Sequence, residues 1–337
     1  MTPIKLGQAK RPAGLALILL AAMAAGCLPR PTPTSTPILI VVTATAPAGT
    51  DVTPVNTGTA TPAPTTSTVE VTALPPTTAP AGQGVLFGPF HLPETEFKAP
   101  YTGAFRGLKT DNAAAILDAA RAAGFRLVIQ LAGSRPNYQA AGGAFSLEGY
   151  QAQLEAFKDF DFAPYVADGT IMGHMMFDEP FDPGNWNGKP VPFADIEAAA
   201  AYSKQFWPTM PVGVGAPATF LDDGAPWSAL DFAFSQYISK FGEVKTWTRN
   251  EVEAARQADL GLLLSINILG GNSRNNVTAE QLKTWGMTLI SEPVVCGLLM
   301  WKYDPGYLQD ANITASLAEI GQAARQRTSP ACQPEGQ

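Results

Sequence analysis

Short apolar runs alternate with amphipathic segments along the chain from residue 84 onward. Each run holds four to eight residues and is bounded by polar or turn-forming positions. This pattern is typical of strands buried on both faces of a parallel sheet. The runs cover residues 85–90, 103–108, 127–131, 171–178, 212–215, 232–238, 262–268 and 296–303. The sequence therefore predicts eight strands.

Amphipathic segments between these runs carry apolar residues three and four positions apart, which is the spacing of a helix that buries one face. Examples are Tyr150, Leu154 and Phe157, then Leu282, Trp285 and Leu289, and finally Ile313, Leu317, Ile320 and Ala324. Residues 248–251 (Thr-Arg-Asn-Glu) and 278–281 (Thr-Ala-Glu-Gln) match the capping box that begins many helices. Eight strands alternating with helices over about 250 residues predict a (β/α)8 TIM barrel, with an open doubly wound sheet as the alternative.

Residues 1–26 read as an export signal. Three basic residues precede an apolar run over residues 14–25, which is too short to span a membrane as a mature helix. The small residues before Cys27 resemble the cleavage box of bacterial lipoproteins, with Ala24 where leucine is commoner. The resemblance implies that Cys27 is the lipid-modified N-terminus, and that the protein is extracytoplasmic and held at the bacterial cell surface. An ordinary signal peptide cut near Gly26 is the alternative, and it also exports the protein.

Residues 27–83 are mostly Thr, Pro, Ala, Ser and Val. Their many prolines break helices and cannot pair within a sheet. With so little patterned apolar surface, the segment cannot offset the entropy lost on folding. We therefore expect an extended tether, with only the apolar stretch 38–42 arguing against complete disorder. Residues 84–337 remain as one folded domain.

The charge of the exported chain limits the class of its partners. Residues 1–26 hold three of the 22 Lys and Arg and none of the 29 Asp and Glu, so the rest carries a formal net charge of −10. Nucleic acid needs Lys and Arg to neutralise its phosphates, so it is excluded as a partner. Two histidines and two cysteines after Cys27 make no zinc-binding cluster, and no phosphate-binding glycine loop is present. We expect neither a metal nor another cofactor.

The stretch over residues 170–180 holds the strongest chemical signal. Its apolar run ends in Asp178, Glu179 and Pro180, where the predicted strand leaves the sheet. In α/β folds, ligand-binding residues gather at the carboxyl ends of strands, so this acid pair is a candidate catalytic site. The alternative is a solvated acidic turn or the N-cap of a helix.

With residues 103–108 counted as the second strand, this stretch becomes the fourth, and Trp301 lies near the end of the eighth. The pattern resembles the clan of retaining (β/α)8 glycoside hydrolases, in which strand four ends in Asn-Glu-Pro and strand eight in tryptophan. The resemblance implies that Glu179 is the acid/base and that Arg106 and Tyr237 lie beside the nucleophile. It also implies hydrolysis or binding of a neutral carbohydrate.

The seventh strand departs from that clan, because it ends in Asn267 where the clan has a nucleophilic glutamate. Retaining hydrolysis needs two carboxyls about 5–5.5 Å apart, and inverting hydrolysis about 6.5–9.5 Å. The second acid is then Asp178 or Asp304, and Asp304 is preferred because adjacent strand residues point to opposite faces. The alternatives are a barrel that binds carbohydrate, or serves adhesion, without cutting it, and a structural envelope protein.

Other polar and aromatic residues near strand ends are candidate ligands of sugar hydroxyls. They are His91, Gln130, Gln236, Tyr237 and Asn267. Each of these groups has a competing role, which is to satisfy a neighbouring backbone group. Trp186, in the turn-rich loop after Pro180, is expected to be exposed and to stack on a sugar. Trp207, Trp247 and Trp285 are expected in the core, and His174 inside the barrel.

Cys296 and Cys332 are the two cysteines that remain after Cys27. Cys296 begins the last strand, at the bottom of the predicted barrel, and the final helix brings Cys332 to the same end. An exported pair placed in this way can form a disulfide.

Overall fold

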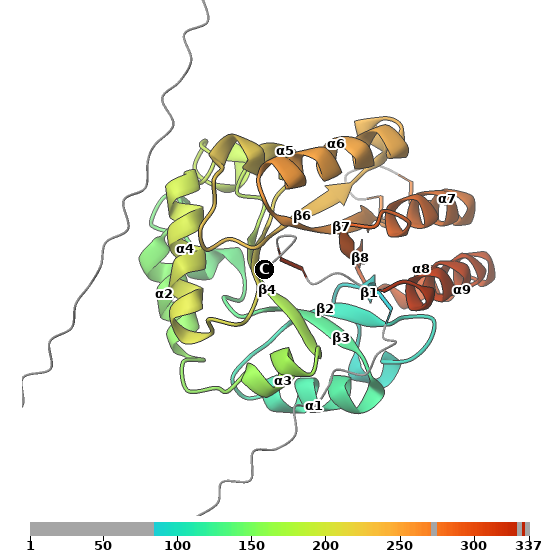
Figure 1. The fold of residues 1–337 in the computed structure, drawn as a ribbon, viewed down its shortest axis with the longest axis horizontal. Coiled ribbons are helices and arrows are strands. Elements are labelled where there is room, and N and C mark those ends of the chain that lie inside the picture. The colour runs from blue at the N-terminus through green and yellow to red at the C-terminus, as the bar shows by residue number, and fades with distance from the viewer. Residues whose placement is uncertain (1–83, 271–274, 329–331, 334–337) are drawn as a thin grey trace, which may run out of the picture. The chain divides into compact units, whose positions relative to one another are not determined.

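The computed structural model describes residues 84–270, 275–328 and 332–333, which lie within one compact unit over Val71–Gln337. The signal peptide, the tether and Cys27 lie outside the described residues, so their assignments stay predictions. Within the described part of the chain, eight strands form one sheet in the order β1-β8-β7-β6-β5-β4-β3-β2, as Figure 1 shows. All the neighbours in this order are paired parallel.

The two strands at the ends of this order meet and close the sheet. The backbone N–H of Thr102 donates to the carbonyl of Phe87, and that of His91 donates to the carbonyl of Phe105, both at 2.9 Å. Phe90 and Phe105 form a parallel bridge between the same two strands. The sheet is therefore a barrel, which confirms the predicted (β/α)8 fold and excludes the open doubly wound sheet.

Each strand lies within two residues of its predicted position. The bounds are β1 Leu86–Pro89, β2 Gly103–Gly107, β3 Arg126–Gln130, β4 Ile171–Asp178, β5 Val212–Gly215, β6 Phe232–Tyr237, β7 Gly261–Asn267 and β8 Val295–Trp301. The helices surround the barrel (Figure 1). Their bounds are α1 Ala113–Ala123, α2 Leu147–Glu155, α3 Ala163–Ala167, α4 Phe193–Phe206, α5 Ala218–Leu221, α6 Val244–Gln257, α7 Ala279–Ile290, α8 Pro305–Leu308 and α9 Ala311–Gln326.

The two predicted capping boxes have different outcomes. Thr278 caps α7 as expected, because its side chain accepts from the N–H of Gln281 and the Gln281 side chain accepts from the N–H of Thr278. The box at 248–251 is wrong, because Thr248 lies inside α6 and its hydroxyl donates to the carbonyl of Val244. The side chain of Glu243 caps that helix instead.

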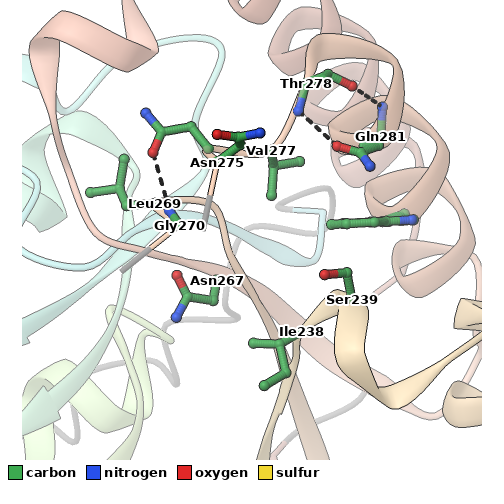
Figure 2. A pocket seen from close by; sticks show the side chains of 11 residues that line it. Ile238, Ser239, Asn267, Leu269, Gly270, Asn275, Val277, Thr278 and Gln281 are labelled. Carbon is green, nitrogen blue, oxygen red and sulfur yellow. Dashed lines mark hydrogen bonds between the residues drawn. The ribbon is translucent and has the colours of Figure 1, made fainter. Parts of the chain in front are cut away.

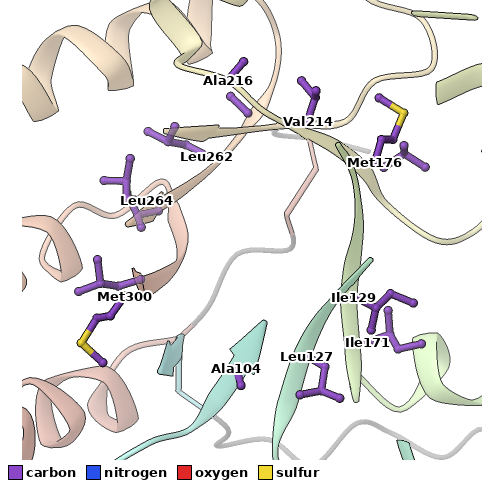
Figure 3. Close-up of a cluster of buried hydrophobic side chains, with 14 of the residues drawn as sticks. Ala104, Leu127, Ile129, Ile171, Met176, Val214, Ala216, Leu262, Leu264 and Met300 are labelled. Carbon is purple, nitrogen blue, oxygen red and sulfur yellow. The ribbon is translucent and has the colours of Figure 1, made fainter. Parts of the chain in front are cut away.

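Alternation along the strands divides the core into two layers. One layer lies between strands and helices, and Figure 3 shows part of it, including Ala104, Leu127, Val214, Leu264 and Met300. The other layer fills the barrel interior with residues that include Leu86, Phe90, Phe105, Val128, Met175, Phe232, Phe234, Leu263, Leu299 and Trp301. The barrel is therefore packed along its axis and is not a pore.

Glycines make room for the largest ring in the interior. A Cβ added at Gly213 would lie 2.2 Å from a ring carbon of Phe232, and one at Gly173 would lie 2.7 Å from the same ring. At the same N-terminal end of the strands, Cys296 joins Cys332 through a disulfide with Cα atoms 5.3 Å apart. The N-terminal end of the barrel is therefore closely packed, whereas polar residues gather at the strand C-termini. No helix in the described ranges is both long and apolar enough to cross a membrane.

Candidate active site

The carboxyl ends of the strands bring several predicted residues to one end of the barrel. Gln236 and Asn267 share the strand face of the interior residues Phe234 and Leu263, because side chains two positions apart point the same way. Gln130 follows Val128 in the same manner on β3. The Trp301 ring packs against the Phe90 ring, with centroids 5.1 Å apart. The interior end of the barrel is thus lined by amides over an aromatic floor.

Asp178, the last residue of β4, has a strongly raised pKa. Burial is the largest cause and the negative charge of Glu179 adds to it, so the pKa of Asp178 rises to about 7, while Arg135 opposes the rise. The carboxyl fits against β5, where a Cβ added at Gly215 would lie 2.3 Å from its Oδ1. The residue as a whole is partly buried, at the C-terminal end of β4. A carboxyl in this state can hold a proton near neutral pH.

Glu179, the residue assigned as acid/base by resemblance, is held by neighbouring loops. Its Oε2 accepts from Arg135 Nη2 at 3.1 Å and from Asn185 Nδ2 at 2.8 Å. Its backbone has a φ of 53°, in the left-handed region that only glycine, and less often Asn, Asp and His, adopts without strain. The Glu179 side chain is 44% exposed. The two acids therefore differ: the Asp178 carboxyl is desolvated, and the Glu179 carboxylate is paired with Arg135.

The prediction that Trp186 is exposed is wrong. Its side chain is only 2% exposed, and its Nε1 donates to the backbone carbonyl of Glu179 at 2.7 Å. Its ring is stacked with Tyr138 and lies edge-on to Phe177. Burial in this aromatic cluster leaves no free face for a sugar, so Trp186 supports the loop that carries Glu179.

Arg106 and Tyr237 point to the outer side of the barrel. Arg106 donates to the carbonyl of Leu92 and forms an ion pair with Glu94 at 2.6 Å. The Tyr237 hydroxyl donates to the carbonyl of Gly242 at 2.7 Å, and its side chain is 2% exposed. Both side chains satisfy nearby groups of the fold, and neither lies in the amide-lined end of the barrel.

His91, directly after β1, lies beside that end. Its ring is edge-on to Trp301 and to Phe105, at centroid distances of 6.3 and 6.2 Å. Partial burial is the main cause that lowers the pKa of His91, and the positive charges of Arg106 and Lys302 add to it. A neutral imidazole that remains solvent-exposed can accept or donate a hydrogen bond. The other histidine, His174, is fully buried beside Trp207.

The candidates for a second carboxylate differ in their surroundings. Asp304, just beyond β8, caps α8, and its Oδ1 accepts from the N–H of Tyr307 at 2.9 Å.

Asn267 occupies the end of β7, and its Oδ1 is buried without a hydrogen-bond partner among the described residues. Asn267 also lines a cavity of about 490 Å³ over the ends of β6 and β7. The described residues hold no cluster of three or more His, Cys, Asp or Glu arranged for a metal.

Sequence reasoning missed the residues that set the state of the acid pair. Arg135 and Asn185 come from the loops after β3 and β4, and Arg135 Nη1 also donates to Asn185 Oδ1 at 2.6 Å. Gly215 makes the space beside Asp178. The sequence pattern did predict that a strand ends at Gly215, and consecutive strands of a barrel are neighbours, so Gly215 could have been placed beside Asp178. Nothing in the spacing of Arg135 or Asn185 pointed to Glu179.

Comparison with known proteins supports the fold. No protein-family model matches the chain, and no curated protein matches it. Among solved structures, an endocellulase from Pyrococcus horikoshii in complex with cellotetraose has a TM-score of 0.50 at 11% identity, over 70% of this chain and 92% of that one. The Gas2 protein of Saccharomyces cerevisiae has a TM-score of 0.50 at 13% identity, over 75% and 68%. A β-galacturonidase from Eisenbergiella tayi has a TM-score of 0.50 at 9% identity, over 73% and 52%. At these identities the likeness shows a shared barrel.

Proposed function

We propose that the barrel is a glycoside hydrolase-like protein that acts on a neutral carbohydrate at the C-terminal ends of its strands. The observation that carries the proposal is the Asp178 carboxyl, whose pKa burial and Glu179 raise to about 7. Glycoside hydrolysis needs such an acid to protonate the leaving oxygen. The amides of Gln130, Gln236 and Asn267 suit sugar hydroxyls, because an amide both donates and accepts. One of the similar barrels, the endocellulase, binds cellotetraose, which is a neutral glycan.

The two neighbouring carboxyls take different roles in this proposal. Asp178 gives its proton to the glycosidic oxygen as the bond to the anomeric carbon breaks, and water then adds to that carbon. Glu179 is held beside Asp178 by Arg135 and Asn185, and its negative charge raises the pKa of Asp178. This assignment exchanges the roles expected from the resemblance, because the desolvated carboxyl is Asp178. The carboxylate that takes the proton from water is Asp304 or Glu179.

A glycan panel with matched variants tests the proposal. Wild type, Asp178→Asn, Glu179→Gln and Asp304→Asn are assayed on cello-, laminari- and xylo-oligosaccharides over pH 4–9. Asp178→Asn is expected to lower turnover by at least about 10²-fold, the usual reach of general acid catalysis. Glu179→Gln is expected to keep activity at low pH but to lose it earlier as pH rises, because Asp178 then releases its proton more easily.

Two outcomes would change the assignment. If Glu179→Gln is inactive at every pH while Asp178→Asn cleaves normally, the acid is Glu179. If no carboxyl variant changes the cleavage of any glycan, the catalytic proposal fails.

The second candidate function is carbohydrate binding without cleavage. The observation that favours it is Asn267 at the end of β7, where the clan that the sequence resembles has its nucleophile. In that case wild type and Asp178→Asn bind the same glycan with equal affinity, and neither releases product.

A further inference from the structure

The cavity over β6 and β7 is a second feature of the same barrel end, separate from the acid pair. It measures about 490 Å³, within the ~300–1,000 Å³ range of small-molecule sites. It lies between the ends of these strands and the first turn of α7, and Figure 2 shows side chains from all three around it. The lining residues are Ile238, Ser239, Asn267, Leu269, Gly270, Asn275, Asn276, Val277, Thr278, Gln281 and Trp285.

None of the described lining residues carries a charged side chain, although the exported chain has a formal net charge of −10. A charged ligand would lose its hydration here without meeting an opposite charge, and that loss is costly. The N-terminus of α7 offers little to an anion, because Thr278 and Gln281 already close a capping box there. The cavity is therefore suited to a neutral ligand.

The polar groups of the cavity are amides and hydroxyls. Asn267 Oδ1 is buried and lacks a hydrogen-bond partner among the described residues, and an unpaired buried oxygen costs free energy until a donor reaches it. Gln281 uses its Oε1 in the capping box, and the box makes no demand on its NH2 group. Asn276 likewise accepts from the N–H of Gly270 through its Oδ1. The cavity thus presents amide donors and one unpaired acceptor to a ligand with hydroxyl groups.

An aromatic wall completes the cavity. Trp285 packs against the core, where it was expected, and its half-buried side chain also lines the cavity. Its ring is held edge-on by Tyr237, with centroids 5.0 Å apart and planes at 80°. A fixed indole beside amide groups has an apolar face for the C–H side of a sugar ring, while the amides meet its hydroxyls.

We infer that this cavity binds one neutral sugar residue of the glycan, through Asn267, Gln281 and the face of Trp285. The inference rests on the proposed carbohydrate function and adds a site that holds substrate away from the acid pair. It restricts the substrate class to glycans with an uncharged unit at this position. A neutral unit is favoured over a uronic acid, because no described lining residue is a cation that would pair with the uronic acid carboxylate.

Gln281→Glu is the sharpest variant for this site. Glutamate at this position also closes a capping box, so α7 keeps its N-terminus, while the NH2 donor is replaced by a negative acceptor. Gln322→Glu makes the same change of charge on the exposed side of α9 and serves as the matched control. Both are made in the full exported chain with Asp178→Asn, so that cleavage does not disturb the measurement.

Calorimetric titration with glucose, xylose, cellobiose, laminaribiose and galacturonate gives the readout. We expect at least one neutral saccharide to bind, galacturonate not to bind, and Gln281→Glu to weaken the neutral saccharide at least about tenfold, the equivalent of 1.4 kcal/mol. Gln322→Glu should bind as its parent does. Tryptophan fluorescence is recorded in the same titrations, and saccharide binding is expected to change it. Trp285→Phe is expected to remove that change.

Equal affinity in Gln281→Glu and its parent would overturn the cavity assignment, and so would the absence of binding by every neutral saccharide. Cleavage by wild type that depends on Asp178 is measured separately. A protein that cleaves glycan but is insensitive to Gln281→Glu therefore disproves the cavity inference and leaves the proposed function standing.

Discussion

Gly215 leaves the space that the Asp178 carboxyl occupies. A Cβ at this position would lie 2.3 Å from Oδ1 of Asp178 and 2.9 Å from its Cα, closer than unbonded atoms approach. Gly215→Ala must therefore move the carboxyl. Displacing a catalytic group by about 1 Å can cost about 10²-fold in rate, so we expect turnover to fall at least tenfold.

Gly107→Ala is the matched control for this prediction. Gly107 ends β2 at the same end of the barrel, and a Cβ there would meet no atom within 4 Å. We expect this variant to keep wild-type turnover and melting temperature. Equal activity in Gly215→Ala and Gly107→Ala would contradict the proposed role of Asp178.

His174 is a buried residue that is expected to lower the stability of the fold. Its side chain is fully buried, and neither ring nitrogen has a hydrogen-bond partner among the described residues. Desolvation lowers the pKa of His174 to about 3. His174→Leu removes these unpaired groups at similar volume, so we expect the free energy of unfolding at pH 7 to rise by about 1–3 kcal/mol.

The pH dependence identifies the cause of that gain. The unfolded chain binds a proton at His174 below about pH 6.5 and the folded protein does not, so the wild type loses stability as pH falls from 6.5 toward 3. The advantage of His174→Leu should therefore widen by up to about 1.4 kcal/mol per pH unit over this range. Denaturant unfolding at pH 7 and pH 5 measures it, and a constant difference would rule out this explanation.

Residue roles were harder to predict than residue positions. The pattern marked Asp178 and Glu179 correctly as a strand end, because the apolar run of β4 stops there. Which carboxyl is desolvated depends on Gly215, Arg135 and the left-handed backbone of Glu179, and these are contacts between separate elements. Trp186 likewise looked exposed from its turn-rich loop, but long-range packing in the aromatic cluster buries it.

Helix α6 is attached to the barrel through a buried carboxylate. Glu251 is 2% exposed and accepts from the N–H of Ala218 at 2.7 Å, from Ser235 Oγ at 2.7 Å and from Thr219 Oγ1 at 2.9 Å. These bonds join α6 to β6 and to α5, which follows the Gly215 end of β5. The carboxylate therefore orders the element beside Asp178.

Glu251→Ala is expected to lower the free energy of unfolding by about 2–4 kcal/mol, because it leaves buried donors unpaired. Glu253→Ala, on the exposed side of the same helix, is the matched control and should change stability by no more than about 0.5 kcal/mol. Thermal and denaturant unfolding compare the two variants. Similar values for both would show that the buried bonds contribute little.

The elements themselves were predictable because each strand has a short apolar run and each gap holds a helical repeat. The capping boxes show the limit of local motifs. Thr278 and Gln281 meet at a true helix start, whereas Thr248 and Glu251 lie inside α6, where Glu251 bonds to other elements. A four-residue pattern cannot distinguish these cases, because tertiary contacts decide which group the side chain meets.

At the scale of the whole molecule, the barrel is expected to fold without the segment before it. Residues 27–83 have no periodic apolar face for the barrel to bury. A chain beginning at Gly82 should therefore melt cooperatively at the same temperature as the chain beginning at Cys27. Scanning calorimetry compares the two, and a large drop for the shorter chain would mean that the segment packs on the barrel, with residues 38–42 as the first suspects.

In the proposed mechanism Asp178 holds a proton near neutral pH at the C-terminal end of the barrel. A 13C NMR titration of the aspartate carboxyl carbons tests it directly and needs no knowledge of the glycan. We predict one carboxyl that titrates near pH 7, that is missing from the spectrum of Asp178→Asn and that shifts to lower pH in Glu179→Gln. An Asp178 carboxyl that titrates near the unperturbed value of about 4 in the wild type would contradict its assignment as the general acid.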